Sequence, residues 1–368
     1  MARLSARQRF LDYVRGVPGA APVVSPFLPH APLVERSLRL LGLPTRGDAV
    51  EQEIALARAL GYEPMFMTDC PGLIFPWQDD PTSSSEEWVV SRLDTAVGPW
   101  ERCVSRRAGL FGDDAGFPVR TEADHEKLVA ACARVADRDA QIRQYFRGFR
   151  QRVGDGGVIV IGHPHVTWLG YQISQPNMIF HAADFPQAYA RSMEAVFQAA
   201  LVVFGIAMEE GIDFMSESGY GLEMISPEQF AAQDLPYTRR LADWTHARGG
   251  LFWYHNCGRT RTLFRSRAFD QLGADVLETV APPPEGDNDL AESRRWLDPA
   301  VCSKGNLSLM LLRDGSAAQV EEATRRMVRA TRGSRHVHST ADAVFAQTPP
   351  ENFVAFVRTA RQEAERCG

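Results

Sequence analysis

Several features that mark non-globular or nucleic-acid-binding chains are missing from these 368 residues. Lys and Arg are outnumbered, 40 against 46 Asp and Glu, and they are scattered instead of forming a basic stripe, which argues against a nucleic-acid partner. No run approaches the roughly 20 apolar residues of a membrane span, and the charged N-terminal stretch does not read as a signal peptide. The sequence therefore predicts a cytoplasmic protein with no membrane partner.

Cysteine is also scarce, with six residues dispersed along the chain. In a cytosolic protein such thiols stay reduced, so metal binding or plain burial explains each of them better than a disulfide. Glycine-rich phosphate loops are absent, because neither G-x-G-x-x-G nor G-x-x-x-x-G-K-[ST] stands between a strand and a helix. This absence disfavours the usual nucleotide-binding sheets.

What the chain does contain is a series of short apolar segments that alternate with helical patterns. The strands are expected at residues 22–27, 64–68, 158–164, 214–218, 251–259, 276–280, 302–306 and 336–340. Eight such strands favour a closed barrel over an open doubly wound sheet, which more often uses about five or six. We predict one α/β domain over residues 1–368, a (β/α)8 TIM barrel with an inserted β-hairpin near residues 85–107 and additional N-terminal helices.

Reactive side chains of an α/β barrel lie where strands end and the following loops begin. The predicted strand ends carry many metal-ligand and acid–base residue types and little that suggests a Ser-His-Asp triad. We predict catalytic groups and substrate-binding residues at these ends: Glu217 and His163 as catalytic, and His165, Tyr220, Asn306 and Trp253 as substrate-binding.

The strongest chemical signal is a His-x-Cys pair at the end of the fifth predicted strand. Because side chains alternate along a strand, His255 and Cys257 emerge on the same side, and zinc accepts imidazole, thiolate and carboxylate ligands. Glu278 and Asp342, at the ends of two other strands, are expected to complete the site. Cys302 is the rival ligand, although it lies at the start of its strand. A buried His–Cys pair without metal stays open as an alternative.

At these residues the chain resembles the uroporphyrinogen decarboxylase superfamily, specifically its corrinoid-dependent methyltransferase branch, typified by methylcobamide:coenzyme M methyltransferases. The resemblance covers essentially the whole chain. It rests on the order of several short motifs: Arg7-Gln8-Arg9-Phe10, Ile225-Ser226-Pro227-Glu228, His255-Asn256-Cys257-Gly258, Pro282-Pro283-Pro284-Glu285-Gly286-Asp287, Lys304-Gly305-Asn306 and Thr348-Pro349-Pro350-Glu351-Asn352-Phe353.

The resemblance implies a TIM barrel with a zinc site in its mouth. In that branch the His-x-Cys motif and a later Cys hold zinc, and a Glu on an intervening strand can ligate it. His255, Cys257 and Glu278 match this pattern, whereas Asp342 stands in the place of the later Cys. A carboxylate in place of a thiolate makes the zinc a harder Lewis acid. This weakens the case for a thiol as the methyl acceptor and leaves an oxygen-bound methyl donor at least as plausible. The segment after the first predicted strand lacks the decarboxylase's arginines, which argues against porphyrin decarboxylation.

We therefore expect a zinc-dependent methyltransferase, a demethylase component that moves a methyl group between a small O-, S- or N-methylated compound, or a thiol acceptor, and a corrinoid. The chain has no Asp-x-His-x-x-Gly segment of the corrinoid-binding type. The resemblance thus implies that a partner corrinoid protein supplies the cobamide. The open alternatives are a zinc hydrolase or lyase with Glu217 or His163 as general base, and a non-catalytic barrel. The methyl donor, the direction of transfer and a homodimer are left unspecified by the sequence.

Overall fold

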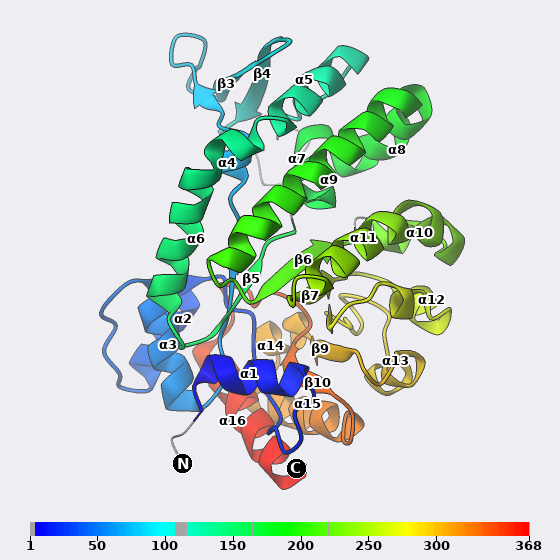
Figure 1. Cartoon of the computed structure of the whole chain (residues 1–368). Helices are drawn as coiled ribbons and strands as arrows, with labels where there is room; N and C mark the ends of the chain where they lie inside the picture. Colours follow the sequence, from blue (N-terminus) through cyan, green and yellow to red (C-terminus); the bar gives the residue numbers. More distant parts are fainter. Residues whose placement is uncertain (1–3, 107–115, 164, 220, 368) are drawn as a thin grey trace. The chain divides into compact units, whose positions relative to one another are not determined.

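A curled sheet of seven parallel strands forms the centre of the fold (Figure 1). The structure is a computed structural model, and it describes residues 4–106, 116–163, 165–219 and 221–367. The strands lie in the sheet in their chain order: β1 Met65–Thr68, β5 Val158–Ile161, β6 Phe214–Ser218, β7 Leu251–His255, β8 Val276–Glu278, β9 Cys302–Leu307 and β10 His336–Thr340. Each of these strands corresponds to a segment predicted from the sequence.

The segment around Val24 closes the sheet into a barrel. Val24 forms a parallel bridge with His338 of β10, and its carbonyl oxygen accepts a 2.9 Å hydrogen bond from the N–H of Glu63, just before β1. This short stretch thus bonds to β10 on one side and to the residue that leads into β1 on the other. The predicted strand over residues 22–27 therefore contributes only a single bridge, but it occupies the eighth position of the ring. The predicted (β/α)8 barrel is confirmed.

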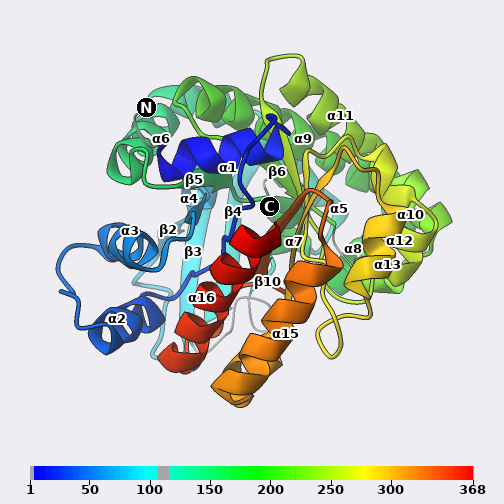
Figure 2. The ribbon, with the colours of Figure 1, turned by 90° about the horizontal axis from the view of Figure 1, so that it is seen from below.

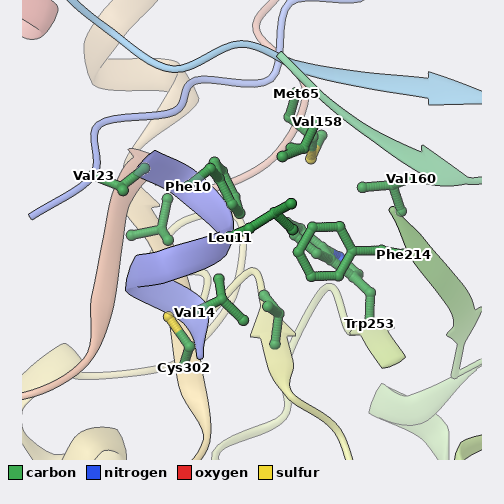
Figure 3. Packing of buried hydrophobic residues seen from close by; sticks show 12 residues of the cluster. Phe10, Leu11, Val14, Val23, Met65, Val158, Val160, Phe214, Trp253 and Cys302 are labelled. Atoms are coloured by element: carbon green, nitrogen blue, oxygen red, sulfur yellow. The ribbon is translucent and has the colours of Figure 1, made fainter. Parts of the chain in front are cut away.

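The barrel interior is filled by alternate residues of its strands. All four residues of β5 are buried, as expected for a strand that is covered on both faces. The inward-facing apolar side chains of the strands form a buried core cluster, and helix α1, Ala6–Val14, packs against it (Figure 3). The ring of Phe10 in α1 stacks 6.3 Å from that of Trp253 and meets Phe214 edge-on at 5.9 Å. The amino-terminal helix thus contributes directly to the core.

Two compact units can be distinguished in the chain. The barrel unit comprises Met1–Thr68, Gly148–Ile161 and Ile212–Gly368, and the helical unit comprises Asp69–Arg147 and Gly162–Gly211. Because both units are built from discontinuous stretches, neither is a separate segment of sequence. The assignment of residues 1–368 to one domain stays a prediction.

Helices of the barrel unit follow the strands in chain order, and α15 and α16 pack side by side (Figure 2). Two starts that the sequence predicted are present as capping boxes, at Asp48 before α3 and at Ser226 before α10. The helical elements after α1 are α2 Ala31–Leu40, α3 Ala49–Leu60, η3 Leu222–Met224, α10 Pro227–Gln233, α11 Leu235–His246, α12 Arg261–Arg265, η4 Ala268–Gln271, α13 Leu290–Trp296, α14 Leu309–Asp314, α15 Ala317–Ala330 and α16 Pro350–Cys367.

The helical unit contains the predicted hairpin. Strands β3 and β4 pair antiparallel, and β2 adds two residues to make a three-stranded sheet. Helix α6, Asp139–Val153, begins in this unit and ends in the barrel unit. The other elements are α4 Pro71–Ile74, β2 Gln78–Asp79, β3 Trp88–Thr95, β4 Gly98–Ser105, α5 Glu122–Cys132, η2 Val135–Arg138, α7 Val166–Ile173, α8 Gln175–Asp184 and α9 Pro186–Glu209.

Helix α9 departs from the expectation that no segment approaches a membrane span. Among the described residues it is the one helix long and apolar enough to cross a membrane by length and composition, and 56% of its most apolar window is buried. Its buried side chains include Val196, Phe197 and Phe204. Length and apolar composition of this kind also occur in the core helix of a soluble protein.

Candidate metal centre

His255 and Glu278 are brought together at the carboxyl ends of the strands, the barrel mouth, by strand pairing. In the parallel register, His255 of β7 lies opposite Glu278 of β8, and Glu278 lies opposite Lys304 of β9. Trp253 and Cys302, two residues earlier on their strands, belong to the interior core cluster. Since side chains alternate along a strand, His255 and Lys304 also point into the barrel interior. They lie nearer the mouth than Trp253 and Cys302 do.

Three potential ligands gather around His255. The ligand atoms of His255, Cys257 and Asp342 all lie within 4.8 Å of one another, and the Nε2 of His255 is 4.0 Å from an Oδ2 of Asp342. His255 and Asp342 are half-buried and Cys257 is exposed. An imidazole, a thiol and a carboxylate form a donor set that suits zinc, with room for an exchangeable fourth ligand. The residues therefore fit a catalytic metal.

Glu278 occupies a different position from these three. One oxygen, Oε1, lies 3.1 Å from the Nδ1 of His255, and the other, Oε2, accepts a 2.7 Å hydrogen bond from the Nζ of Lys304. The side chains of Glu278 and Lys304 are each 2% exposed. Glu278 was predicted as a ligand, but here it contacts the ring nitrogen on the other side of the imidazole. This is the place of the carboxylate that commonly orients a metal-binding His.

The electrostatics of this group favour an ionised carboxylate beside a protonatable ring. Burial alone would raise the pKa of Glu278, but the Lys304 ammonium and His255 outweigh it and hold that pKa well below its usual range. Burial alone would likewise lower the pKa of His255. Hydrogen bonds to Cys257 and Glu278, together with the charge of Asp342, raise it instead. Without a cation, the cluster therefore attracts a proton to the imidazole.

Asn256 fixes the backbone of the His-x-Cys motif. Its carbonyl oxygen accepts hydrogen bonds from the N–H and the hydroxyl of Thr279, at 2.8 and 3.0 Å. Its side-chain oxygen accepts another from the hydroxyl of Thr260, which in turn accepts one from the Nδ2 of Asn288. The buried side chains of Asn256, Thr260 and Asn288 thus connect the loop after β7 to the loop after β8. A polar residue inside the His-x-Cys motif is a signal that the sequence carries for this role, but Asn256 was not among the predicted site residues.

Lys304 was also overlooked as a functional residue. It stands inside β9, all six residues of which are buried. A Lys is almost never fully buried unless it is paired. Its position in a buried strand therefore already predicted a carboxylate partner, although only the fold identifies that partner as Glu278.

The structure does not place Glu217 in the barrel mouth. Phe214 belongs to the interior cluster, so alternation turns Glu217, three residues later, to the outer face of β6. There it is buried beside Tyr254. Burial, and next to it the charges of Asp234 and Glu217, raise the pKa of the Tyr254 phenol. This position does not support the predicted catalytic role of Glu217.

Two further predicted residues belong to the core instead of the site. Trp253 is fully buried and packs against α1, because it lies one level below His255. It was predicted to bind substrate, and this prediction is not supported. Cys302, the rival metal ligand, is also fully buried, and burial raises the pKa of its thiol to about 12. It belongs to the interior core cluster and not to the group of His255, Cys257 and Asp342.

Asn306 lies beside a cavity of about 540 Å³ that it lines together with Leu290, Leu311 and Met327, from α13, α14 and α15. Its backbone N–H faces the sulfur of Met327 at 3.3 Å. None of the three grouped ligands lines this cavity. The predicted contact of Asn306 with substrate stays a prediction.

The three remaining predicted site residues, His163, His165 and Tyr220, follow β5 and β6. His163 and His165 belong to the helical unit. His165 is fully buried there, with its Nε2 3.3 Å from the carbonyl oxygen of Met193 and its ring 5.7 Å from Phe197. It is thus a packed core residue of that unit. His163 is half-buried, and its role stays a prediction. Tyr220 lies outside the described residues.

Asp69, directly after β1, was not singled out from the sequence. Burial raises its pKa to about 6. Within the helical unit, its carboxylate accepts hydrogen bonds from the N–H of Cys70 at 2.7 Å and from the indole of Trp168 at 3.3 Å. An acidic residue at a strand end was the available signal. The elevated pKa makes Asp69 a candidate acid–base group.

Comparison with known proteins places this chain in a family. The model of the family described as uroporphyrinogen decarboxylase matches residues 118–363. A solved methyltransferase from Methanosarcina mazei superposes with a TM-score of 0.68 at 15% identity, covering 98% of this chain and 99% of that one. A B12-independent methionine synthase from Shewanella sp. W3-18-1 gives a TM-score of 0.48 at 9% identity, covering 94% and 98%.

At this identity, the likeness to the Methanosarcina protein concerns the fold. No curated protein matches the chain by sequence. The family model, in contrast, spans well over half of the chain and includes the His-x-Cys motif and every strand from β5 to β10. The chain belongs to the uroporphyrinogen decarboxylase family.

Proposed function

We propose that this protein is a zinc-dependent methyltransferase that moves a methyl group between a small O-, S- or N-methylated compound, or a thiol acceptor, and the corrinoid of a partner protein. The observation that carries the proposal is the grouping of His255, Cys257 and Asp342 at the mouth of a barrel of this family. The structural neighbour from Methanosarcina mazei is itself named a methyltransferase. We further propose a cytoplasmic location, and a homodimer stays an open prediction.

In this proposal, His255, Cys257 and Asp342 hold the metal, and Glu278 orients the imidazole through Nδ1. When bound, zinc would supply a Lewis acid that polarises the heteroatom of the methylated compound or lowers the pKa of a bound thiol. Asn256 keeps the two ligands of the motif in register with β8. The chain's own contribution is thus a preorganised ligand set with an open side.

Asp342 bears on the substrate class. A carboxylate donates less charge to zinc than a thiolate would, so the metal stays a stronger Lewis acid. Activation of an oxygen leaving group needs such an acid, whereas a metal-bound thiolate nucleophile benefits from an electron-rich one. We therefore favour an O-methyl compound as the methyl donor.

A zinc hydrolase or lyase is the second candidate function. It requires a general base within hydrogen-bonding reach of a bound water. Glu217, one of the two bases that the sequence offered, faces away from the barrel interior on β6. This geometry argues against a hydrolase with Glu217 as its base, while the alternative with His163 as the base stays a prediction.

The test combines metal analysis with a transfer assay. We expect one zinc per chain in the purified protein, and methyl transfer to free cob(I)alamin from small methyl ethers, followed by the cobalamin absorption spectrum. His255→Ala should lose zinc and transfer together. His246→Ala, at an exposed position at the end of α11, should keep both. A His255→Ala protein that retains wild-type transfer would contradict the proposal.

A further inference from the structure

A chain of three polar side chains crosses the barrel interior beneath the proposed metal. Lys304 contacts Glu278 at 2.7 Å, and Glu278 contacts the Nδ1 of His255 at 3.1 Å. The three residues lie opposite one another on β9, β8 and β7. The far nitrogen of His255, Nε2, faces Asp342 at 4.0 Å. The contacts therefore run in a line from a buried ammonium to the ligand group.

Lys304 has little freedom within this arrangement. Its side chain is 2% exposed, and its Nζ lies 5.7 Å from the ring centre of Trp253, a fully buried residue. An ammonium in such surroundings is strongly destabilising unless it faces an anion, and the carboxylate of Glu278 is that anion. The side chain of Glu278 in turn places the carboxylate against the imidazole of His255 on β7. Packing and charge thus restrict both partners to one geometry.

Both oxygens of Glu278 are engaged by this geometry. Oε2 faces Lys304, and Oε1 faces the imidazole of His255. For Glu278 to turn toward the group of His255, Cys257 and Asp342, it would have to leave a buried cation without its partner. That loss is expensive in a low-dielectric interior.

We propose that Lys304 is a positioning residue of the metal centre, which acts through Glu278. The ammonium holds Glu278 on the Nδ1 of His255, so that Nε2 stays directed toward Asp342 and Cys257, and it keeps the Glu278 carboxylate out of the metal's ligand set. This inference rests on the proposed zinc function. It adds a residue that the ligand pattern does not contain, and it assigns Glu278 to the imidazole instead of the metal.

The first readout uses the metal-free protein. A hydrogen-bonded imidazole N–H gives a proton NMR signal far downfield, which His255→Gln should remove and thereby assign. We expect Lys304→Met, which keeps the length of the side chain and removes its charge, to shift or broaden this signal. Lys304→Arg should restore it in part. A signal that Lys304→Met leaves unchanged would overturn the proposal, whether or not the protein binds zinc.

The second readout uses Co²⁺ in place of zinc. We expect Lys304→Met to weaken zinc binding by about 10- to 100-fold, the usual effect of losing an outer contact, and to lower the intensity of the Co²⁺ absorption bands as Glu278 joins the metal. Glu278→Gln tests the contact between Lys304 and Glu278 by removing the charge of the carboxylate. If Lys304 acts through Glu278, the double variant should bind zinc no more weakly than Glu278→Gln alone.

The outcomes separate the two proposals. Wild-type protein that shows no thiolate-to-Co²⁺ charge-transfer band would refute the proposed metal centre, while the proton signal would still test the role of Lys304. Should Lys304→Met fail to fold by circular dichroism, the comparison of Lys304→Arg with Glu278→Gln decides. Equal zinc affinity and equal Co²⁺ spectra in wild type, Lys304→Arg and Glu278→Gln would then overturn the inference.

Discussion

His255 shows how much one side chain depends on its neighbours along and across the strands. Its own strand directs it to the interior, its Nδ1 contacts Glu278, and Glu278 is in turn paired with Lys304. The neighbouring Asn256 holds the loop in place. The proposed metal site thus depends on its three candidate ligands and also on the residues that orient them.

Asp213 is a second residue on which several elements depend. Its carboxylate is 1% exposed and accepts hydrogen bonds from Arg7 at 2.7 Å, Arg150 at 3.0 Å and the N–H of Ile159 at 2.8 Å. It thus links α1, α6 and β5 at the amino-terminal end of the barrel.

We expect Asp213→Ala to lower the free energy of unfolding by about 3–5 kcal/mol, because the largely buried guanidinium of Arg150 and the N–H of Ile159 both lose their acceptor. Urea unfolding followed by circular dichroism measures the change. As a control, Asp139→Ala removes a more exposed pair with Arg143 within α6 and should cost less than about 1 kcal/mol. Equal losses in the two variants would contradict the role assigned to Asp213.

At the scale of the element, β9 depends on a glycine beside the site. Gly305 has a φ of +146°, and a Cβ at this position would collide with the carbonyl oxygen of Thr279 in the loop after β8. Any larger residue must therefore push β9 away from the loop that carries Thr279. Because Lys304 immediately precedes Gly305, such a shift also disturbs the contact with Glu278.

We expect Gly305→Ala to destabilise the protein by more than about 1 kcal/mol, since it combines a strained φ with a backbone clash, and to weaken zinc binding. Gly148→Ala in α6 is the matched control. A Cβ there meets no atom within 4 Å, and Ala favours a helix over Gly by up to about 1 kcal/mol. Thermal unfolding and zinc titration of both variants provide the measurement, and a Gly305→Ala protein as stable as Gly148→Ala would refute the argument.

At the scale of the whole molecule, buried histidines couple stability to pH. Burial, and after it the neighbouring His181, lower the pKa of His125 in α5 to about 4. Its Nδ1 lies 2.8 Å from the hydroxyl of Ser192, and its Nε2 lies 3.0 Å from the Nδ1 of His181. The folded state thus holds His125 neutral where the unfolded chain, with a pKa near 6.5, takes up a proton.

The sign follows from this difference in pKa. Because the unfolded state binds more protons, stability is lost as the pH falls from about 6.5 toward about 4, by up to about 1.4 kcal/mol per pH unit. We expect His125→Phe to reduce this slope in urea unfolding measured between pH 7 and pH 4.5. His246, whose pKa is raised first of all by its hydrogen bond to Asp275, should act in the opposite direction. An unchanged slope in His125→Phe would show that His125 does not carry the effect.

Strand periodicity in the sequence predicted the barrel because each buried strand keeps its apolar pattern whatever surrounds it. The same periodicity predicted that His255 and Cys257 emerge together, and their ligand atoms do lie within 4.8 Å of one another, although β7 itself ends at His255. It failed for Trp253, because depth along the barrel axis separates core from mouth and local alternation carries no information on depth. It failed for Glu217 because a strand end in a barrel has both an inner and an outer face.

The sequence by itself determined the strands, the hairpin, the capped helix starts and the His-x-Cys pair, because these depend on contacts within a few residues. Only the tertiary structure decided that Asp342 joins this pair, that Cys302 is buried away from it, and that Glu278 is shared between His255 and Lys304. Such choices depend on the register between strands far apart in the chain. That register is set by the packing of the whole barrel.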